Sequence, residues 1–506
     1  MANDQAVLFI SAGILFWVVI YRWHTNPLNA IPTVGGFSTP PLSYVGAVSF
    51  IRRGRETLHE GYKKHYGSAF KIPLLDRWMV IVSGPKMVED IRRRPEDELS
   101  FTATVETLLQ YRYTVSQKMH DDPYHVAIVK EKLQNRMLPA IMPDLIDEVG
   151  TTVQKYFPAE GNEWVSVDVL SSALKIVART SNRVFVGLPV CRNEEYNDIS
   201  VQFAVEIVKA GTALFLFPDV LKPFAAPFVS KVKQTTERAL LHLQPIIRQR
   251  IAAMQEKEKE KEWLDKPNDI LQWIIDRAVA KQETDAEITE RLLLLNLAAV
   301  HTSSSSMSQV LYHLAERPDL LLSLREEVEA VIDAEGWSTS SFAQMWKLDS
   351  ILRESQRYNG FTLASLMRVA MKDIILDNGM LIPKGTILGV PAHPMHFDDA
   401  HFPNADVFDP FRFARMREAA RDGQGSARHQ FASTSSEYIP FGHGHLACPG
   451  RYFAANQLKA VLSYIILNYD LKLAENLQRP QNMYVSLAVL PPMGGNILLR
   501  KRVVAA

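Results

Sequence analysis

One cysteine, in a loop rich in glycine and proline, constrains this chain more than any other feature. Cys448 lies within residues 438–451, and a helical pattern over residues 453–469 follows it. Pro449 suits the first position of that helix, where a missing N–H group costs nothing. We therefore expect Cys448 at a helix N-terminus, where backbone N–H groups and the helix dipole favour the thiolate. A stabilised thiolate is a nucleophile or a metal ligand.

The neighbours of Cys448 predict that the loop approaches a large partner closely. Gly442, Gly444 and Gly450 allow the backbone to pass near something flat or bulky. Phe441 supplies an apolar wall on the same stretch.

Composition excludes some classes of protein. The 506 residues are 47% apolar, which is enough for a large core. Formal net charge is zero and no basic tract is interleaved with aromatic residues, so nucleic acid is not an expected partner. Cys191 and Cys448 do not form a disulfide framework and fit a reducing compartment.

The N-terminus predicts a membrane anchor. Residues 6–21 carry no charge and Arg22 follows them. This run is near the lower limit of about 17 residues for a spanning helix, and Trp17, Tyr21 and Trp23 extend it as an interfacial aromatic belt. We expect a retained single-pass anchor over residues 1–24 with its cationic side cytoplasmic. A cleaved signal peptide and a buried N-terminal helix are the alternatives.

A mainly helical body follows the anchor. Residues 25–41 are rich in proline and glycine and read as a stiff hinge, so the catalytic body is placed at residues 42–506. Strand pairs are expected at residues 69–82 and 374–390, where turn residues separate short apolar runs. The apolar residues 213–229 form either a membrane-dipping lid over a substrate entrance or an ordinary core helix–loop–helix.

A polar island interrupts the longest apolar helix of the body. This helix spans residues 292–314, and residues 301–306 read His-Thr-Ser-Ser-Ser-Ser. Hydroxyl side chains compete with the backbone hydrogen bonds of a helix. The helix is therefore either opened there, as at many functional sites, or its hydroxyls bond to carbonyl groups one turn earlier.

A second helix, over residues 348–358, carries an ion pair. Glu354 and Arg357 are three residues apart and share one face. Their neighbours are apolar, which favours burial, and a buried pair requires a further partner for the arginine.

Together these features resemble the cytochrome P450 family of haem-thiolate monooxygenases across essentially the whole chain. The cysteine loop carries the most specific motif. The amino-acid sequences of the motifs are most similar to those of fungal, membrane-anchored enzymes of terpenoid secondary metabolism. The motifs, in chain order, are residues 298–303, Glu354-x-x-Arg357, residues 410–413 with Arg412, and Phe441-x-x-Gly444-x-x-x-Cys448-x-Gly450.

The resemblance implies a mainly α fold with small β-sheets, in which haem lies between the long central helix and the cysteine loop. It makes Cys448 the axial ligand of the haem iron, where a thiolate favours O–O cleavage. Phe441 would pack near the sulfur, within the loop shaped by Gly444 and Gly450. Arg368 matches a ligand of a haem propionate.

On the central helix, the resemblance assigns Thr302 to guiding the protonation of oxygen and makes Arg412 the third member of a buried triad with Glu354 and Arg357. Three positions depart from the family pattern. His301 replaces an acid, and its ring either relays protons or is structural. Ala299 replaces glycine, and Leu446 replaces a basic propionate ligand. The family's Trp–Arg pair is also missing from the helix near residues 124–130, where Lys130 or His125 is a candidate substitute.

The implied function is hydroxylation or further oxidation of a hydrophobic substrate, terpenoid or steroid-like, with O2. No G-x-G-x-x-G motif opens a strand–helix unit, so the chain binds no flavin or dinucleotide of its own. Electrons would come from NADPH–cytochrome P450 reductase, with cytochrome b5 as a candidate second donor. The implied location is the endoplasmic reticulum membrane, in contact with lipid, with the catalytic domain cytosolic.

Two other functions remain to be distinguished. A haem-thiolate isomerase or dehydratase would use the same fold without O2. A structural zinc site could use His443, His445 and Cys448, although zinc sites require four ligands in recurring pairs.

Overall fold

The computed structural model describes residues 23–39, 42–260, 265–420 and 425–502, together with Trp17, Tyr21 and Trp263. Most of the predicted anchor, residues 1–24, lies outside these ranges, as do Pro40 and Pro41 of the predicted hinge. Among the described residues, no helix combines the length and the apolar character that crossing a bilayer requires.

The protein is mainly helical, as predicted. The helices of the first half are α2 (Leu42–Lys64), α3 (Pro85–Arg93), α4 (Phe101–Leu109), α5 (Tyr111–Thr114), α6 (Gln117–Asp121), α7 (Tyr124–Lys132), α8 (Met142–Tyr156), α9 (Val169–Phe185), α10 (Glu194–Leu214), α11 (Lys222–Val229) and α12 (Val232–Glu260). Those of the second half are α13 (Ile270–Ala280), α14 (Asp285–Glu316), α15 (Pro318–Glu335), α16 (Thr339–Gln344), α17 (Trp346–Asn359), α18 (Ala392–His396), α19 (Arg412–Ala419) and α20 (Arg451–Asn468).

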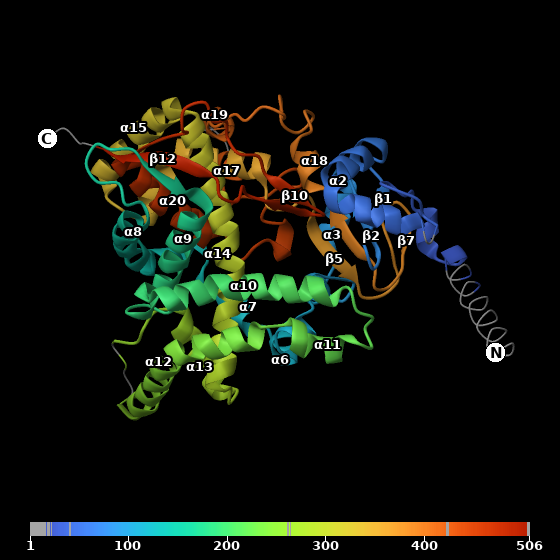
Figure 1. Ribbon diagram of the computed structural model, residues 1–506, viewed down its shortest axis with the longest axis horizontal. Coiled ribbons are helices and arrows are strands. Elements are labelled where there is room, and N and C mark those ends of the chain that lie inside the picture. Colours follow the sequence, from blue (N-terminus) through green and yellow to red (C-terminus); the bar gives the residue numbers. More distant parts are fainter. Residues whose placement is uncertain are drawn as a thin grey trace.

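Small sheets complete the fold, and the expected strand pairs are confirmed. The largest sheet has the order β1 (Ala69–Pro73), β2 (Trp78–Val82), β8 (Ile387–Val390), β5 (Ser365–Ala370) and β3 (Leu99–Ser100). The others are β4 (Val165–Asp168), β12 (Asn496–Lys501) and β9 (Tyr469–Lys472) in that order, β6 (Ile374–Ile375) with β7 (Leu381–Ile382), and β10 (Met483–Val485) with β11 (Ala488–Leu490). Most helices gather on one side of the molecule, and the largest sheet lies with α2 on the other (Figure 1).

Helix α14 is the central element. It begins with a capping box, in which the side chain of Thr284 accepts from the backbone of Glu287 and the Glu287 carboxylate accepts from the backbone of Thr284. The helix then runs unbroken for 32 residues, with α9, α10, α12, α13, α17 and α20 packed against it. Because the helix is long and largely buried, its side chains contact the core along most of its length.

The described part of the proline-rich segment is packed on the body. Residues 27–30 form a short 3₁₀ helix, and Thr33 pairs with Lys71 of β1. The buried Lys71 ammonium group donates to the Leu28 carbonyl at 2.6 Å. Ile31 lies in the core with 1% of its surface exposed. This segment therefore fixes the direction from which the chain enters the catalytic body.

The surface around α11 is apolar. Phe228 is 90% exposed and Phe224 is 72% exposed, whereas Ala226 between them is buried. Leu216 and Val220, in the turn between α10 and α11, are also exposed. An ordinary core helix would bury these side chains, so the exposure favours the lid interpretation of residues 213–229 over the core one.

Candidate active site

The loop that contains Cys448 is folded back on itself by backbone hydrogen bonds. The Cys448 N–H donates to the Phe441 carbonyl at 2.8 Å, and the Gly442 N–H donates to the Ile439 carbonyl at 3.0 Å. Gly444 has a φ of +79°, and a Cβ atom there would lie 2.5 Å from Cγ of Arg92. Only glycine meets both conditions, because L side chains rarely adopt this φ and no space exists for one.

Cys448 lies just before α20. The helix begins at Arg451, so Pro449 precedes its first residue rather than occupying it. The backbone N–H groups of Gly450 and Arg451 nevertheless point at the sulfur. Burial raises the pKa of the Cys448 thiol, while these N–H groups and the Arg451 charge act against that rise. A metal ion at the sulfur would remove the proton outright, and the two N–H groups would then stabilise the thiolate.

The side chains near Cys448 supply no further metal ligand. His443 bonds through Nδ1 to the Thr434 hydroxyl at 3.0 Å, and His445 is exposed. Within the described part of the chain, no group of three or more His, Cys, Asp or Glu side chains could hold a metal ion. The zinc-site alternative is therefore wrong. Phe441 packs edge-to-face on Phe431, with ring centroids 5.3 Å apart, and forms the predicted apolar wall.

The polar island keeps α14 helical. The Thr302 hydroxyl donates to the Ala298 carbonyl at 2.9 Å, and the Ser304 and Ser306 hydroxyls likewise donate to carbonyl groups four residues earlier. The structure thus shows the second of the two predicted states, a continuous helix whose hydroxyls bond back along the chain. Ala298 is exposed and Thr302 is half-buried, although this part of α14 lies in the core. That face of the helix is left uncovered by protein.

His301 and Thr302 point to different neighbours. The His301 Nε2 atom lies 3.0 Å from the Val201 carbonyl of α10. A carbonyl only accepts, so Nε2 carries the proton of this bond. Burial lowers the pKa of His301, which favours the neutral ring. The sequence could not predict where the His301 side chain points, because its contact with Val201 joins residues 100 positions apart.

The predicted triad is present and buried. Glu354 receives Arg357 Nη2 at 2.7 Å and Arg412 Nε at 3.2 Å, which confirms the third partner. Arg357 also donates to the Ala405 carbonyl at 2.8 Å, so the triad holds the loop before α19 against α17. Both members of the 2.7 Å pair have no exposed side-chain surface, so each guanidinium depends on this carboxylate for its charge balance.

Arg368 is a buried cation without a carboxylate partner among the described residues. It is 4% exposed, and its Nη1 donates to the neighbouring Met367 carbonyl at 2.7 Å. Burial lowers the pKa of Arg368 to about 10, and the negative charge of Glu96 opposes that shift only in part. The preceding bulge in β5 lets Ser365 reach the Ile439 carbonyl at 2.9 Å, which ties this strand to the cysteine loop.

The two candidate substitutes for the missing Trp–Arg pair, both on α7, have different surroundings. His125 is buried and its Nδ1 lies 3.2 Å from Arg291, within a cluster that includes Glu283. Its ring is therefore engaged by the Arg291 guanidinium. Lys130 is exposed on α7, and its ammonium group forms no hydrogen bond or ion pair with a described residue.

These residues fit haem. One sulfur donor suits an iron whose other ligands come largely from the porphyrin itself. The uncovered face of α14 offers an apolar surface with one hydroxyl, and the unpaired Arg368 offers a cation for a carboxylate substituent. Sequence motifs predicted the cysteine, the threonine of α14 and the arginine of this site. The hydrogen bond from Ser365 to the Ile439 carbonyl could not be predicted, because no local sequence pattern indicates it.

Comparison with known proteins agrees with this site. The family model for cytochrome P450 matches residues 37–499. The chain is 45% identical to cytochrome P450 monooxygenase CYP512U6 of Ganoderma lucidum over 99% of its own length and 97% of the relative. It is 40% identical to cytochrome P450 monooxygenase 151 of Postia placenta, over 99% and 100% of the two chains. Ent-kaurene oxidase of Gibberella intermedia is 29% identical over 96% and 91%.

The match covers the body from the end of the proline-rich segment to the last strand, and the relatives align along nearly their entire length. The cysteine loop, the buried triad and the uncovered face of α14 all lie within it. The chain therefore belongs to the cytochrome P450 family of haem-thiolate monooxygenases.

Proposed function

We propose that this monooxygenase hydroxylates or further oxidises a terpenoid or steroid-like substrate in fungal secondary metabolism. The observation that carries the proposal is the Thr302 hydroxyl on the uncovered, otherwise apolar face of α14. A related fungal protein is named ent-kaurene oxidase, which supports a hydrophobic terpenoid as the substrate class. NADPH–cytochrome P450 reductase supplies the electrons, with cytochrome b5 as a second donor.

Haem, when bound, supplies the chemistry of oxygen activation. In this proposal Cys448 ligates the iron, Phe441 covers the sulfur, and Gly444 and Gly450 let the loop approach the porphyrin. Arg368 pairs with a propionate, because its buried guanidinium forms no ion pair with a described residue.

The two residues predicted as catalytic take different roles here. Thr302 holds a proton at its hydroxyl beside the reacting oxygen, on the face of α14 that protein does not cover. His301 keeps α10 against α14 through its bond to Val201, and so shapes the site from one residue away.

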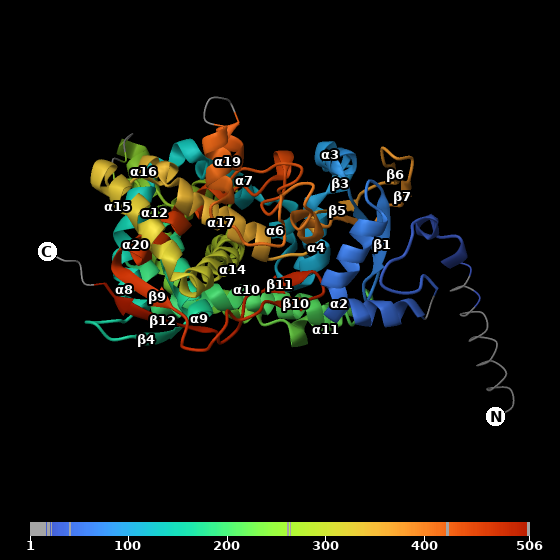
Figure 2. The same cartoon turned by 90° about the horizontal axis from the view of Figure 1, so that it is seen from above.

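We further propose that the protein is a single-pass endoplasmic reticulum protein with its catalytic domain in the cytosol, residues 1–24 being the anchor. Exposed apolar side chains on α11 and at the start of α2 support contact with lipid, and Figure 2 shows both helices along one edge of the molecule. The residues in α2 and before it are Phe37, Leu42, Tyr44, Val45 and Val48. Residues 213–229 then form a lid through which a hydrophobic substrate enters from the membrane.

The test uses membranes that contain the chain together with an NADPH–cytochrome P450 reductase. Ent-kaurene and lanosterol are supplied under ¹⁸O₂, and products are identified by mass spectrometry. One labelled oxygen per oxidation step is the expected result. Unlabelled, rearranged product, with turnover unchanged in Thr302→Ala, would instead establish an isomerase or dehydratase.

A further inference from the structure

The His301 ring has one nitrogen that no described residue uses. Its Nε2 atom donates to the Val201 carbonyl of α10 at 3.0 Å, and a carbonyl oxygen only accepts. A neutral imidazole carries one proton, so Nδ1 keeps a lone pair and is a hydrogen-bond acceptor. Burial lowers the pKa of His301 and thereby favours this neutral form. The Val201 contact therefore decides which nitrogen of the ring can receive a hydrogen bond.

The Nδ1 atom is open to the interior of the site rather than sealed in the core. It has no hydrogen-bond partner among the described residues. It is also not one of the fully enclosed polar atoms that lack a partner in the described part of the chain. Some surface of Nδ1 is therefore accessible, although the residues on the other sides of this part of α14 are buried.

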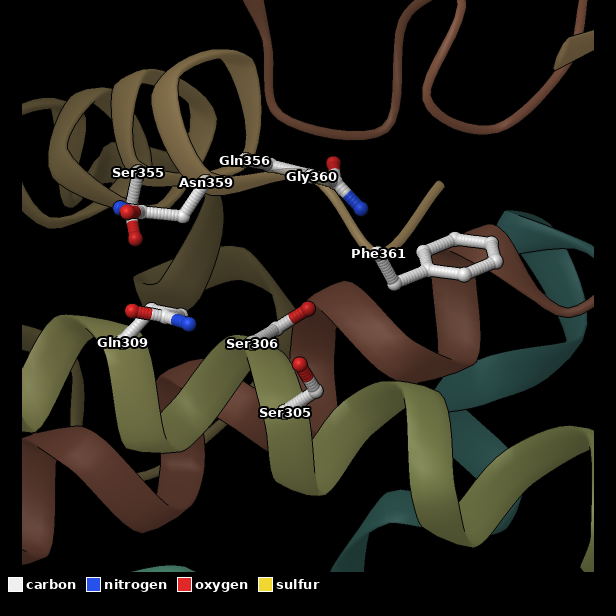
Figure 3. A pocket seen from close by; sticks show the side chains of 8 residues that line it. All are labelled: Ser305, Ser306, Gln309, Ser355, Gln356, Asn359, Gly360 and Phe361. Carbon is white, nitrogen blue, oxygen red and sulfur yellow. The ribbon is translucent and has the colours of Figure 1, made fainter. Parts of the chain in front are cut away.

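Helical spacing places this ring beside the uncovered face of α14. Ala298, His301, Thr302 and Ser305 recur at intervals of three and four residues, so they form one stripe, and all four keep accessible surface. One turn beyond Thr302, Ser305 and Phe361 line the same small cavity. Figure 3 shows the Ser305 side chain on the side of α14 where Phe361 lies. The open side of His301 thus borders the space in which a substrate lies beside Thr302.

The lone pair of a neutral imidazole selects for a hydrogen-bond donor. The Thr302 hydroxyl already donates to the Ala298 carbonyl at 2.9 Å, so it does not serve Nδ1. A hydrocarbon that displaces water from Nδ1 leaves this acceptor without a partner, which is unfavourable. An alcohol supplies the missing O–H group, whereas a ketone, an ether or a carboxylate brings only acceptors.

We propose that His301 is a specificity-determining residue whose Nδ1 atom accepts a hydrogen bond from a hydroxyl group of the substrate. The preferred substrates are then terpenoid or steroid alcohols, rather than the corresponding hydrocarbons, ketones or carboxylates. This inference rests on the proposed function, because it names the chemical class of substrate for the site assigned there.

The test measures the binding of two alcohols, lanosterol and ent-kaurenol, and of the two analogues in which fluorine replaces the hydroxyl group. Fluorine is similar to a hydroxyl group in size but donates no hydrogen bond. Dissociation constants are determined by equilibrium dialysis of labelled ligand against haem-loaded protein in lipid nanodiscs, with empty nanodiscs as the blank. Neither NADPH nor a reductase is present, so the result does not depend on turnover.

Two substitutions of His301 and one control are compared with the wild type. His301→Leu removes both ring nitrogens, whereas His301→Gln offers an amide that can donate to Val201 and accept through its oxygen. Ser308→Ala is the control on the same helix, because Ser308 is buried and its hydroxyl donates to the Ser304 carbonyl at 2.8 Å.

The wild type and Ser308→Ala should bind at least one alcohol about five-fold more tightly than its fluoro analogue, which is the net effect of one hydrogen bond between neutral groups. His301→Leu should lose this preference through weaker binding of the alcohol alone, and His301→Gln should retain most of it. A crystal structure of the haem-loaded wild type with the preferred alcohol should place the alcohol oxygen within hydrogen-bonding distance of Nδ1.

A preference for the alcohol that is the same in His301→Leu as in the wild type would overturn the inference, because His301 would then only hold α10 in place. A wild type that binds neither alcohol more tightly than its fluoro analogue would also overturn it. If His301→Leu does not retain haem, the crystal structure decides, and an alcohol oxygen bonded elsewhere refutes the role of Nδ1. If the wild type shows the preference but forms no ¹⁸O-labelled product, the proposed function fails and recognition by His301 stands.

Discussion

Replacing Glu354 by glutamine tests whether the buried triad supports the fold around the cysteine loop. The substitution keeps the shape of the side chain but leaves Arg357 and Arg412 with no carboxylate at 2.7 Å and 3.2 Å. Removing one partner of a buried ion pair costs about 3–5 kcal/mol, because the remaining charge stays desolvated. Proteins unfold with an entropy of about 2.1 cal/mol/K per residue, so for 506 residues this loss corresponds to a melting temperature lower by about 3–5 °C.

The control is an ion pair with the same separation and different burial. Arg317 and Asp319 also approach to 2.7 Å, but their side chains are 53% and 61% exposed. Asp319→Asn should therefore change the unfolding free energy by less than about 1 kcal/mol. Differential scanning calorimetry of the haem-loaded proteins at one scan rate, with haem content measured in parallel, compares the two variants. Equal shifts in melting temperature for Glu354→Gln and Asp319→Asn would refute the claim that burial makes the Glu354 ion pair more costly to break than an exposed one.

Other expectations concern the cysteine loop, the haem cation and pH. Gly444→Ala should lose haem-thiolate absorption, whereas Gly379→Ala, with a φ of +81° but open space at its Cβ, should retain it and lose only about 1 kcal/mol in chemical denaturation. Arg368→Leu should release haem several-fold faster to an excess of haem-binding apoprotein, and an unchanged rate would exclude the propionate pairing. Burial lowers the pKa of Lys71 to about 8. Above that pH the unfolded chain binds more protons, so the Lys71 contribution to the unfolding free energy should rise up to about pH 10.4. Urea midpoints of Lys71→Met should lack this rise.

Local patterns were sufficient to predict many of the elements. The pairing of β1 with β2 follows from alternating apolar residues around a short turn, and residues 69–82 form that pair in the structure. The cysteine loop was also predictable, because glycine and proline have strong conformational preferences and the sequence contains only one cysteine besides Cys448. The helix start was misplaced by two residues, since a proline marks a helix beginning without fixing its first residue.

Contacts between distant residues were beyond the reach of these patterns. The bond from His301 to Val201 joins positions 100 apart, and that from Gln309 to Asn482 joins positions 173 apart. The sequence left two states open for the polar island, because a serine hydroxyl bonds equally well to its own helix or to another group. Only packing around α14 decides between them, and with it whether Ser355 is left without a protein partner.

The absorption spectrum of the reduced, CO-bound protein tests the central assignment most directly. A haem iron ligated by the Cys448 thiolate should give a strongly red-shifted Soret band, and Cys448→Ala should abolish it. A wild-type spectrum without that shift, or the same shifted band in Cys448→Ala, would contradict the assignment of Cys448 as the haem ligand.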